Sequence, residues 1–235
     1  GVGRFRANVF RQRGSFGAVI RVIPFGLPNP ADFHIPDEVL RLARLQKGLV
    51  LVTGPAGAGK STTLACIIDK LNHERSGHII TMEDPIEYVH KHGSCIVTQR
   101  EVPTDLATYG EELRSATRES PDVILLGEMR DYETIGAAIE AADTGHLVIA
   151  TLHTNSAPDT ISRIINSFPA ERQEQIRITL AETLLAVICQ SLVPSPTAPR
   201  GRVVAQEIMI VTPGIANNIR ENDIPAIKNA LTDTS

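Results

Sequence analysis

The segment GPAGAGKS, residues 54–61, restricts the possible folds of this chain more than any other part of it. It fits the pattern G-x-x-x-x-G-K-[ST] and lies between an apolar, strand-like run and a segment typical of a helix. Its glycines let successive backbone N–H groups turn inward around phosphate oxygens without a clashing Cβ atom, and the start of the helix adds partial positive charge. The pattern therefore predicts a phosphate-binding loop between a strand and a helix.

The chemistry expected at this loop is the binding of a nucleoside triphosphate. Lys60 would reach the β- and γ-phosphates, and the Ser61 hydroxyl would bind Mg²⁺. The residues that we expect to contact the nucleotide here are Gly54, Pro55, Ala56, Gly57, Ala58, Gly59, Lys60, Ser61 and Thr62. ATP and Mg²⁺ are the cofactors that the motif predicts.

Short apolar strands alternate with helices along the rest of the chain. The strands that we predict are 48–54, 78–82, 95–99, 123–127 and 146–153, and the helices are 37–48, 60–71, 106–119, 132–142, 158–167, 171–190 and 214–220. Such strands between helices indicate a mainly parallel sheet covered by helices on both faces. The fold class expected is therefore α/β.

The first 36 residues follow a different pattern. Alternation in RFRANVF and AVIRVIP, separated by the turn-like RQRGSFG, predicts a β-hairpin that ends at Pro24. We interpret residues 1–24 as the C-terminal remnant of a small domain, residues 25–36 as an extended, proline-rich linker and residues 37–235 as the α/β domain. The composition of residues 194–201 predicts an exposed loop.

Ligands of parallel sheets gather at the carboxyl ends of the strands, so the residues that follow each predicted strand are candidates for chemistry. Beyond the phosphate loop these are Glu83 with Asp84, then Glu128, then His153. Glu128 could polarise the attacking water or hold Mg²⁺, directly or through water, and the sequence leaves both roles open. The alternative is a solvated loop acid that pairs with Arg130. The residue before it, where many phosphate-loop ATPases carry an aspartate, is Gly127, so this strand offers a single acid.

The remaining acids and histidines have several interpretations. Glu83 suits the positioning of water near Mg²⁺–ATP, and an ordinary Asp–Pro turn after a strand is the alternative. His153, at a carboxyl end, can donate to a γ-phosphate and register its loss. His146 lies at the opposite end of the same strand, where a packing role and an intersubunit role both stay open.

Arginines are candidates for stabilising the charge of a phosphoryl-transfer transition state. The candidates are Arg4, Arg6 and Arg21 on the hairpin, and Arg100, Arg114 and Arg118 in the domain. Residues 1–24 hold five arginines and no acid, and arginine suits forked recognition of phosphate. The sequence does not rank these six residues.

Composition excludes several classes of protein. The net charge of −4 argues against a dedicated nucleic-acid binder. Three cysteines without a CxxC pair give little support to a zinc site or a disulfide framework, and favour a reducing compartment. No apolar run approaches the ~18 residues of a membrane span. We therefore expect a cytoplasmic chain without a covalent membrane anchor.

Several longer motifs carry a resemblance to a known family. They are GPAGAGKSTTL, TMEDPIEYVH, TQREV, the run from LRSATRESPDVILLGEMRD to ATLHTNSAPDT, and GRVVAQEIMIVTP. In this order and spacing, they resemble the secretion ATPase superfamily, and most of all its type IV pilus retraction (twitching-motility, PilT-like) branch. The resemblance extends over essentially the whole chain.

The resemblance implies a RecA-like ATPase domain, preceded by a PAS-like domain, in a homo-hexameric ring. Residues 54–61 match the Walker A loop, TMEDPIE matches the aspartate box with Glu83, and VILLGEMRD matches the Walker B strand with Glu128. GHLVIATLH matches the histidine box, which carries His146 and His153. In the family, arginines of the N-terminal domain approach the nucleotide, which implies this role for Arg4, Arg6 and Arg21.

The function implied is Mg²⁺-dependent ATP hydrolysis that drives domain motion and pilus retraction, by force on an inner-membrane platform protein. The motor would lie in the cytoplasm, peripheral at the inner face of the membrane. The missing four-cysteine module favours retraction over assembly or secretion, whereas GIANNIREN departs from the AIRNLIRE-type helix of retraction enzymes. The C-terminal helices of the family are expected to be truncated. The alternatives are an assembly or secretion motor, a small-molecule kinase, a non-hydrolysing scaffold gated by nucleotide and a DNA translocase.

Overall fold

A computed structural model describes residues 3–23, 26–196, 198 and 201–232. The strands are β1 (Arg4–Gln12), β2 (Ser15–Ile23), β3 (Gly48–Thr53), β4 (Gly77–Glu83), β5 (Cys95–Glu101), β6 (Val123–Leu126), β7 (Leu147–Leu152), β8 (Leu184–Pro194) and β9 (Arg202–Ile210). The α-helices are α1 (Asp37–Arg41), α2 (Lys60–Glu74), α3 (Tyr109–Ala116), α4 (Tyr132–Asp143), α5 (Ala157–Asn166), α6 (Ala170–Thr183), α7 (Pro213–Arg220) and α8 (Ile224–Thr232). Short 3₁₀ helices cover Pro30–Phe33 (η1), Leu42–Arg44 (η2) and Thr117–Glu119 (η3).

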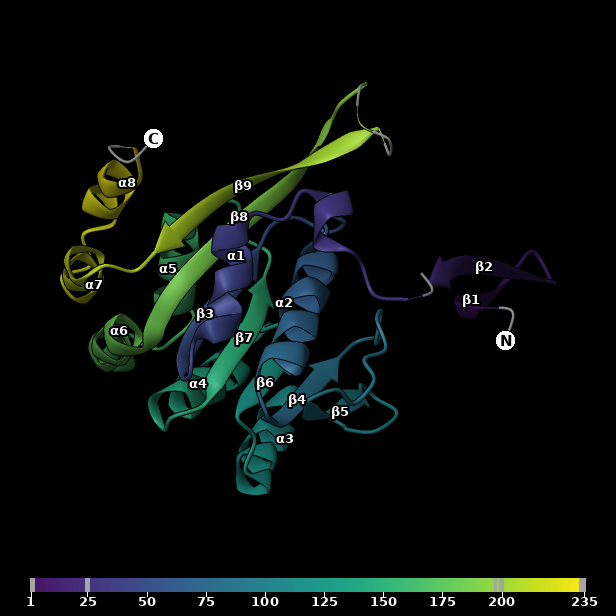
Figure 1. Cartoon of the computed structure of the whole chain (residues 1–235), viewed down its shortest axis with the longest axis horizontal. Coiled ribbons are helices and arrows are strands. Elements are labelled where there is room, and N and C mark those ends of the chain that lie inside the picture. Colours follow the sequence, from purple (N-terminus) through teal and green to yellow (C-terminus); the bar gives the residue numbers. More distant parts are fainter. Residues whose placement is uncertain (1–2, 24–25, 197, 199–200, 233–235) are drawn as a thin grey trace.

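Seven strands form one sheet in the order β5-β4-β6-β7-β3-β8-β9. All neighbouring pairs are parallel except β8 with β9, which is antiparallel. Every residue of β3, β6 and β7 is buried, which explains their continuous apolar sequences. The predicted α/β fold with a mainly parallel sheet is confirmed (Figure 1).

Two apolar layers cover the two faces of this sheet. Successive residues of β3 alternate between them, because side chains of a strand point to opposite faces. Leu49 and Leu51 pack in the layer that contains α3 to α8, whereas Val50 and Val52 pack in the layer built by α1, η2 and α2. The phosphate-loop helix α2 is thus fixed against one face of the strand that precedes it.

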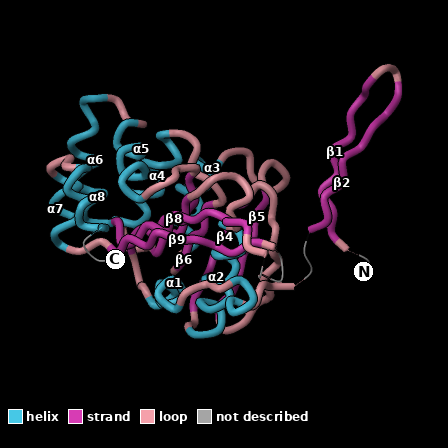
Figure 2. The backbone as a smooth tube through the Cα atoms, turned by 90° about the horizontal axis from the view of Figure 1, so that it is seen from above, coloured by secondary structure: helices cyan, strands magenta, loops and turns pink. Residues whose placement is uncertain are grey.

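The hairpin predicted for the N-terminal residues is confirmed. β1 pairs antiparallel with β2 from Arg4 opposite Ile23 to Gln12 opposite Ser15, and the two form a separate sheet. Figures 1 and 2 show this hairpin standing apart from the seven-stranded sheet. A hydrogen bond from Arg4 Nη2 to the carbonyl oxygen of Ile86, in the loop after β4, connects the hairpin to the domain at 2.9 Å.

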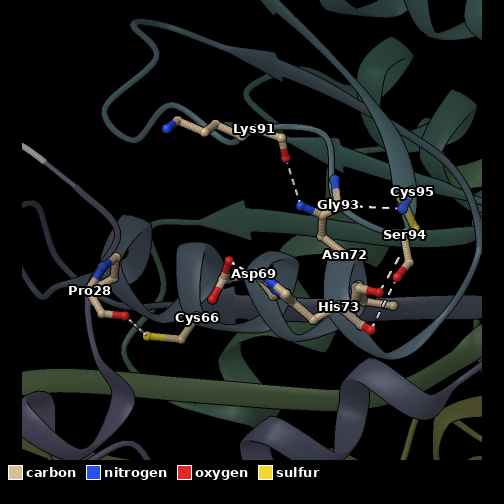
Figure 3. Close-up of polar contacts among 10 residues, drawn as sticks. Pro28, Cys66, Asp69, Asn72, His73, Lys91, Gly93, Ser94 and Cys95 are labelled. Atoms are coloured by element: carbon tan, nitrogen blue, oxygen red, sulfur yellow. Dashed lines mark hydrogen bonds and ion pairs between the residues drawn. The ribbon is translucent and has the colours of Figure 1, made fainter.

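The proline-rich stretch after the hairpin is less extended than predicted. Residues 24 and 25 lie outside the described residues, and Pro30–Phe33 form the 3₁₀ turn η1, which Asn29 caps with its side chain. The Cys66 thiol on α2 lies 3.7 Å from the carbonyl oxygen of Pro28, and the two appear together in Figure 3. This contact near the start of the stretch, and the buried side chain of Ile35 near its end, pack it on the domain. Of the predicted loop at 194–201, residues 197, 199 and 200 lie outside the described residues.

One predicted helix is wrong in its second half. The helix expected at 171–190 ends at Thr183, and residues 184–194 form β8 beside the central strand β3. The antiparallel partner β9 and the helix α8 were not predicted. The apolar run of residues 184–189 fits a buried strand and a buried helix equally well by its pattern. In the described part of the chain, no helix combines the length and the apolar character needed to cross a bilayer.

Candidate nucleotide-binding site

The predicted phosphate loop connects β3 to α2, as its sequence requires. Gly57 and Gly59 have φ angles of 78° and 88°, in the left-handed region that favours glycine, and Gly59 is the N-cap of α2. A Cβ atom on Gly54 would lie 2.1 Å from the carbonyl oxygen of Gln190. The backbone of β8 therefore presses against the start of the loop, and only glycine fits there.

Gln190 supports the phosphate loop, and the sequence did not single it out. Its side chain is 2% exposed, accepts a hydrogen bond from Thr63 Oγ1 at 2.9 Å, and donates to the carbonyl oxygen of Ala58 at 2.7 Å. Gln206 Nε2 on β9 donates to the same Gln190 oxygen at 3.3 Å. Gln190 thus ties the loop and α2 to the antiparallel edge of the sheet. The sequence does offer one indication, because Gln190 is a polar residue inside the apolar run 184–193. We predicted residues 171–190 as a helix, however, so this indication was not used.

Lys60 lies over the loop that precedes it. Its ammonium group donates to the carbonyl oxygens of Gly54 at 2.7 Å and Pro55 at 3.0 Å, and lies 3.4 Å from Nδ1 of His153. Burial lowers the pKa of Lys60, and the nearby carboxylate of Glu128 opposes this shift. The lysine from the loop and the histidine from the end of β7 are therefore neighbours.

Glu128 is held by two cationic or polar partners. Arg130 Nε donates to Glu128 Oε2 at 2.7 Å, and His153 Nε2 lies 3.2 Å from Glu128 Oε1. The hydrogen bond and the charge of Glu128 raise the pKa of Arg130, so this guanidinium stays charged. A line of groups thus runs from Lys60 through His153 and Glu128 to Arg130. The pairing of Glu128 with Arg130 does not remove the acid from the cavity, because both residues line it.

Glu83 lies at the carboxyl end of β4, partly buried. Thr81 Oγ1 and Gln99 Nε2 both donate to Glu83 Oε1, at 2.8 and 3.1 Å. Burial raises the pKa of Glu83, and these two hydrogen bonds oppose the rise. A carboxylate in such a setting holds a proton more strongly than an exposed glutamate does.

These groups line one cavity of about 290 Å³. It contains the phosphate-loop residues Ala56, Gly57, Lys60 and Ser61, the acids Glu83, Asp84, Glu87 and Glu128, and also Tyr88, Tyr109, Arg130 and His153. We predicted that the residues after four strands meet at one edge of the sheet, and the structure places residues that follow β3, β4, β6 and β7 in this one cavity. Tyr109 was not predicted. Burial, with the charge of Asp84, raises its pKa to about 12, and its hydroxyl has no hydrogen-bond partner among the described residues.

The predicted arginines do not join this cavity. Arg6 and Arg21 face each other across the hairpin and are exposed, and Arg4 contacts Ile86. Arg100 pairs with Glu112 and, at 2.9 Å, with Glu119. Arg114 and Arg118 are exposed outside the cavity.

His146 does not reach the site. Its Nδ1 lies 2.9 Å from the carbonyl oxygen of Ala141, so it packs at the amino end of β7.

The residues present suit a nucleotide-bound magnesium ion. Ser61 and Glu128 provide oxygen atoms at the same cavity, and oxygen is the ligand type that Mg²⁺ prefers. Within the described ranges, no group of three or more His, Cys, Asp and Glu residues could hold a metal ion. Phosphate oxygens and water would therefore have to complete the coordination of Mg²⁺.

Comparison with known proteins identifies the family of this chain. The profile of the family described as "Type II/IV secretion system protein" matches residues 33–229. The chain is 50% identical over 231 residues to the "Type IV pilus retractation ATPase PilT" of Pseudomonas aeruginosa, covering 98% of this chain and 67% of the relative. It is 46% identical to the "Twitching motility protein" of Neisseria gonorrhoeae, covering 98% of this chain and 61% of the relative.

A solved structure has the same fold. The crystal structure of the pilus retraction motor PilT with bound ADP superimposes with a TM-score of 0.94 at 52% identity, over 98% of this chain and 67% of that one. This chain thus spans about two thirds of these relatives. The match of the family profile, the sequence identities and the shared fold agree: the chain belongs to the type II/IV secretion system protein family.

Proposed function

We propose that this chain is an Mg²⁺-dependent ATPase that drives domain motion in a homo-hexameric motor for type IV pilus retraction. The observation that carries the proposal is the meeting of Lys60, Glu83, Glu128 and His153 at one cavity beside a phosphate loop. The 50% identity to the Pseudomonas retraction ATPase supports retraction as the output. The mechanical work would act on an inner-membrane platform protein, from the cytoplasmic side.

Each group has a chemical role in this proposal. The loop amides and Lys60 bind the phosphates, and the ammonium group stabilises charge that develops on the γ-phosphate oxygens. Glu83 positions the attacking water, because its raised pKa makes it a better proton acceptor than an exposed carboxylate. His153 lies between Lys60 and Glu128, so the loss of the γ-phosphate would change the hydrogen bonds of both.

Mg²⁺ supplies charge neutralisation on the β- and γ-phosphates when it is bound. The residues that would hold it are Ser61 and Glu128, the latter directly or through water. Arg130 orients the Glu128 carboxylate through the hydrogen bond from its Nε.

The hairpin arginines are proposed to act from a neighbouring chain or after domain motion. Arg6 and Arg21 are exposed on a hairpin that touches the domain through Arg4 and Ile86. In a ring, these arginines would complete the site of an adjacent subunit.

Phosphate release tests the proposed reaction. Lys60→Ala should abolish nucleotide binding and turnover, and Glu128→Gln should lower turnover by about 10²–10³-fold while ATP still binds. Lys70→Ala is the matched lysine control, because Lys70 lies on the same helix but pairs with the exposed Glu74. Turnover by Lys60→Ala at the wild-type rate would refute the ATPase proposal.

A gene deletion tests the biological output. Hyperpiliated cells that do not twitch would support retraction, whereas cells without pili would indicate an assembly motor. If the Lys70→Ala gene restores the wild-type phenotype and the Lys60→Ala gene does not, the phenotype depends on ATP hydrolysis.

A further inference from the structure

The side chain of Gln99 connects the candidate acid Glu83 with the loop that follows it. Gln99 lies on β5, directly opposite Thr81 in the parallel pairing with β4. Its Nε2 donates to Glu83 Oε1 at 3.1 Å and to the carbonyl oxygen of Tyr88 at 3.0 Å. Its Oε1 accepts from the backbone N–H of His90 at 2.7 Å. One amide therefore makes three hydrogen bonds to two parts of the cavity wall.

Only a glutamine side chain meets all three demands at this position. Nε2 of a carboxamide carries two N–H groups, which here serve the Glu83 carboxylate and the Tyr88 carbonyl, and its oxygen accepts from His90. A glutamate would offer no donor, and a methionine of similar length would offer neither a strong donor nor a strong acceptor. The arrangement therefore depends on the amide and not on the shape of the side chain.

The loop that Gln99 holds also contacts the phosphate-loop helix. The Tyr88 hydroxyl lies 3.1 Å from Thr62 Oγ1, and Thr62 follows Ser61 at the start of α2. The far end of this loop is fixed by Asn72, near the end of α2. Its side chain donates to the carbonyl oxygen of Lys91 at 2.8 Å and accepts from Gly93 N at 3.0 Å (Figure 3). The segment from Glu83 to Gly93 is thus held from β5 in its middle and from α2 at two points.

We propose that Gln99 is a positioning residue for ATP hydrolysis, which orients Glu83 and couples it to the loop that contacts α2. This inference rests on the proposed function, because Glu83 is an acid of that reaction. Gln99 itself does not line the cavity, so it acts through Glu83 and through Tyr88. Nothing in the sequence pattern set Gln99 apart from the other polar residues of TQREV.

Other charged and titratable groups around Glu83 bear on its ionisation. Glu87, on the same loop, raises the pKa of Glu83 through its charge, and its backbone hydrogen bond opposes that rise. Tyr109 on α3 lies among Glu83, Asp84, Glu128 and Arg130, and burial raises the pKa of its phenol to about 12. Thr81 and Gln99 are the side chains that donate hydrogen bonds to Glu83.

The test compares Gln99→Met, Thr81→Val and Gln175→Met with the wild type. Gln99→Met removes all three bonds, and Thr81→Val removes the other donor to Glu83 without touching the loop. Gln175→Met is the control, because Gln175 is exposed on α6 and its side chain donates a hydrogen bond to Thr179, on the same helix. The measurements are kcat and KM for ATP from pH 5 to 9, and the pKa of Glu83 by ¹³C NMR of labelled glutamate, with Glu83→Gln to assign the signal.

We expect Gln99→Met to lower kcat by about tenfold or more with a smaller change in KM, because a displaced catalytic group slows the chemical step. In both Gln99→Met and Thr81→Val, the pKa of Glu83 should rise, and the acid limb of the kcat profile should move to higher pH. Gln175→Met should match the wild type.

Two results would overturn the inference while the proposed function stands. One is a Gln99→Met enzyme with wild-type kcat and pH profile, and the other is a lower kcat with an unchanged pKa of Glu83. If the wild type releases no phosphate, the proposed function fails and takes the catalytic part of the inference with it. The NMR titration then still decides whether Gln99 controls the ionisation of Glu83.

Discussion

Replacing Gln190 by methionine should remove the hydrogen bonds that hold the phosphate loop to β8, while the buried side chain keeps a similar size. Methionine has a similar length but cannot bond Thr63, Ala58 or Gln206. The Thr63 side chain and Ala58 are buried, and a buried polar group without a partner costs about 1–3 kcal/mol. Two such groups give an expected loss of about 2–6 kcal/mol in the free energy of unfolding.

The assay is thermal and urea unfolding, with ADP affinity measured in parallel. For a chain of this size, each kcal/mol lowers Tm by roughly 2–4 °C. ADP affinity should fall as well, because Ala58 and Thr63 flank Gly59 and Lys60. Gln206→Met is the control, since it removes only the 3.3 Å bond at the edge of this network. A Gln190→Met protein with the Tm and ADP affinity of this control would refute the role of Gln190 as an anchor.

Three further substitutions test the site. Glu83→Gln should raise Tm at pH 8. The pKa of Glu83 is raised, so the folded chain binds a proton at this group more readily than the unfolded chain does. The ionised Glu83 therefore lowers the stability of the fold as pH rises through the folded pKa. That gain should vanish as pH falls to about 4, the range of an ordinary glutamate, and a gain independent of pH would contradict the argument. Tyr109→Phe should remove the late step of a spectrophotometric tyrosine titration, near a pKa of about 12, and leave Tm equal or higher, because its hydroxyl is unpaired in the described structure. Gly127→Asp should lower stability by about 1–3 kcal/mol through crowding, which urea unfolding would measure.

The position of the site could be predicted from the sequence because its parts follow simple rules. Lys60 belongs to a motif with fixed spacing, and Glu83, Glu128 and His153 each follow an apolar run. Because parallel strands bring their carboxyl ends to the same edge, residues far apart in the chain had to converge there. The structure places all four at one cavity.

The anchoring of the site could not be predicted in the same way. Gln190 lies in an apolar run that we predicted as a helix. In the structure this run is the strand β8, which pairs in parallel with β3. Gln99 lies on β5, where only the register against Thr81 directs its amide to Glu83. Such residues act through tertiary hydrogen bonds, and the sequence carries no periodic signal for them.

The single acid after β6 has a structural explanation in the packing of two strand ends. A Cβ atom on Gly127 would lie 3.2 Å from the Cα atom of Glu83, the carbonyl oxygen of Met82 and the hydroxyl of Tyr109. The Gly127 N–H also donates to the Met82 carbonyl at 2.7 Å, so β4 and β6 meet closely at this point. An aspartate here would crowd these three atoms, so its neighbours would have to shift by a few tenths of an ångström. Because the glycine allows this close approach, Glu83 at the end of β4 and Glu128, two residues beyond β6, reach the same cavity from neighbouring strands.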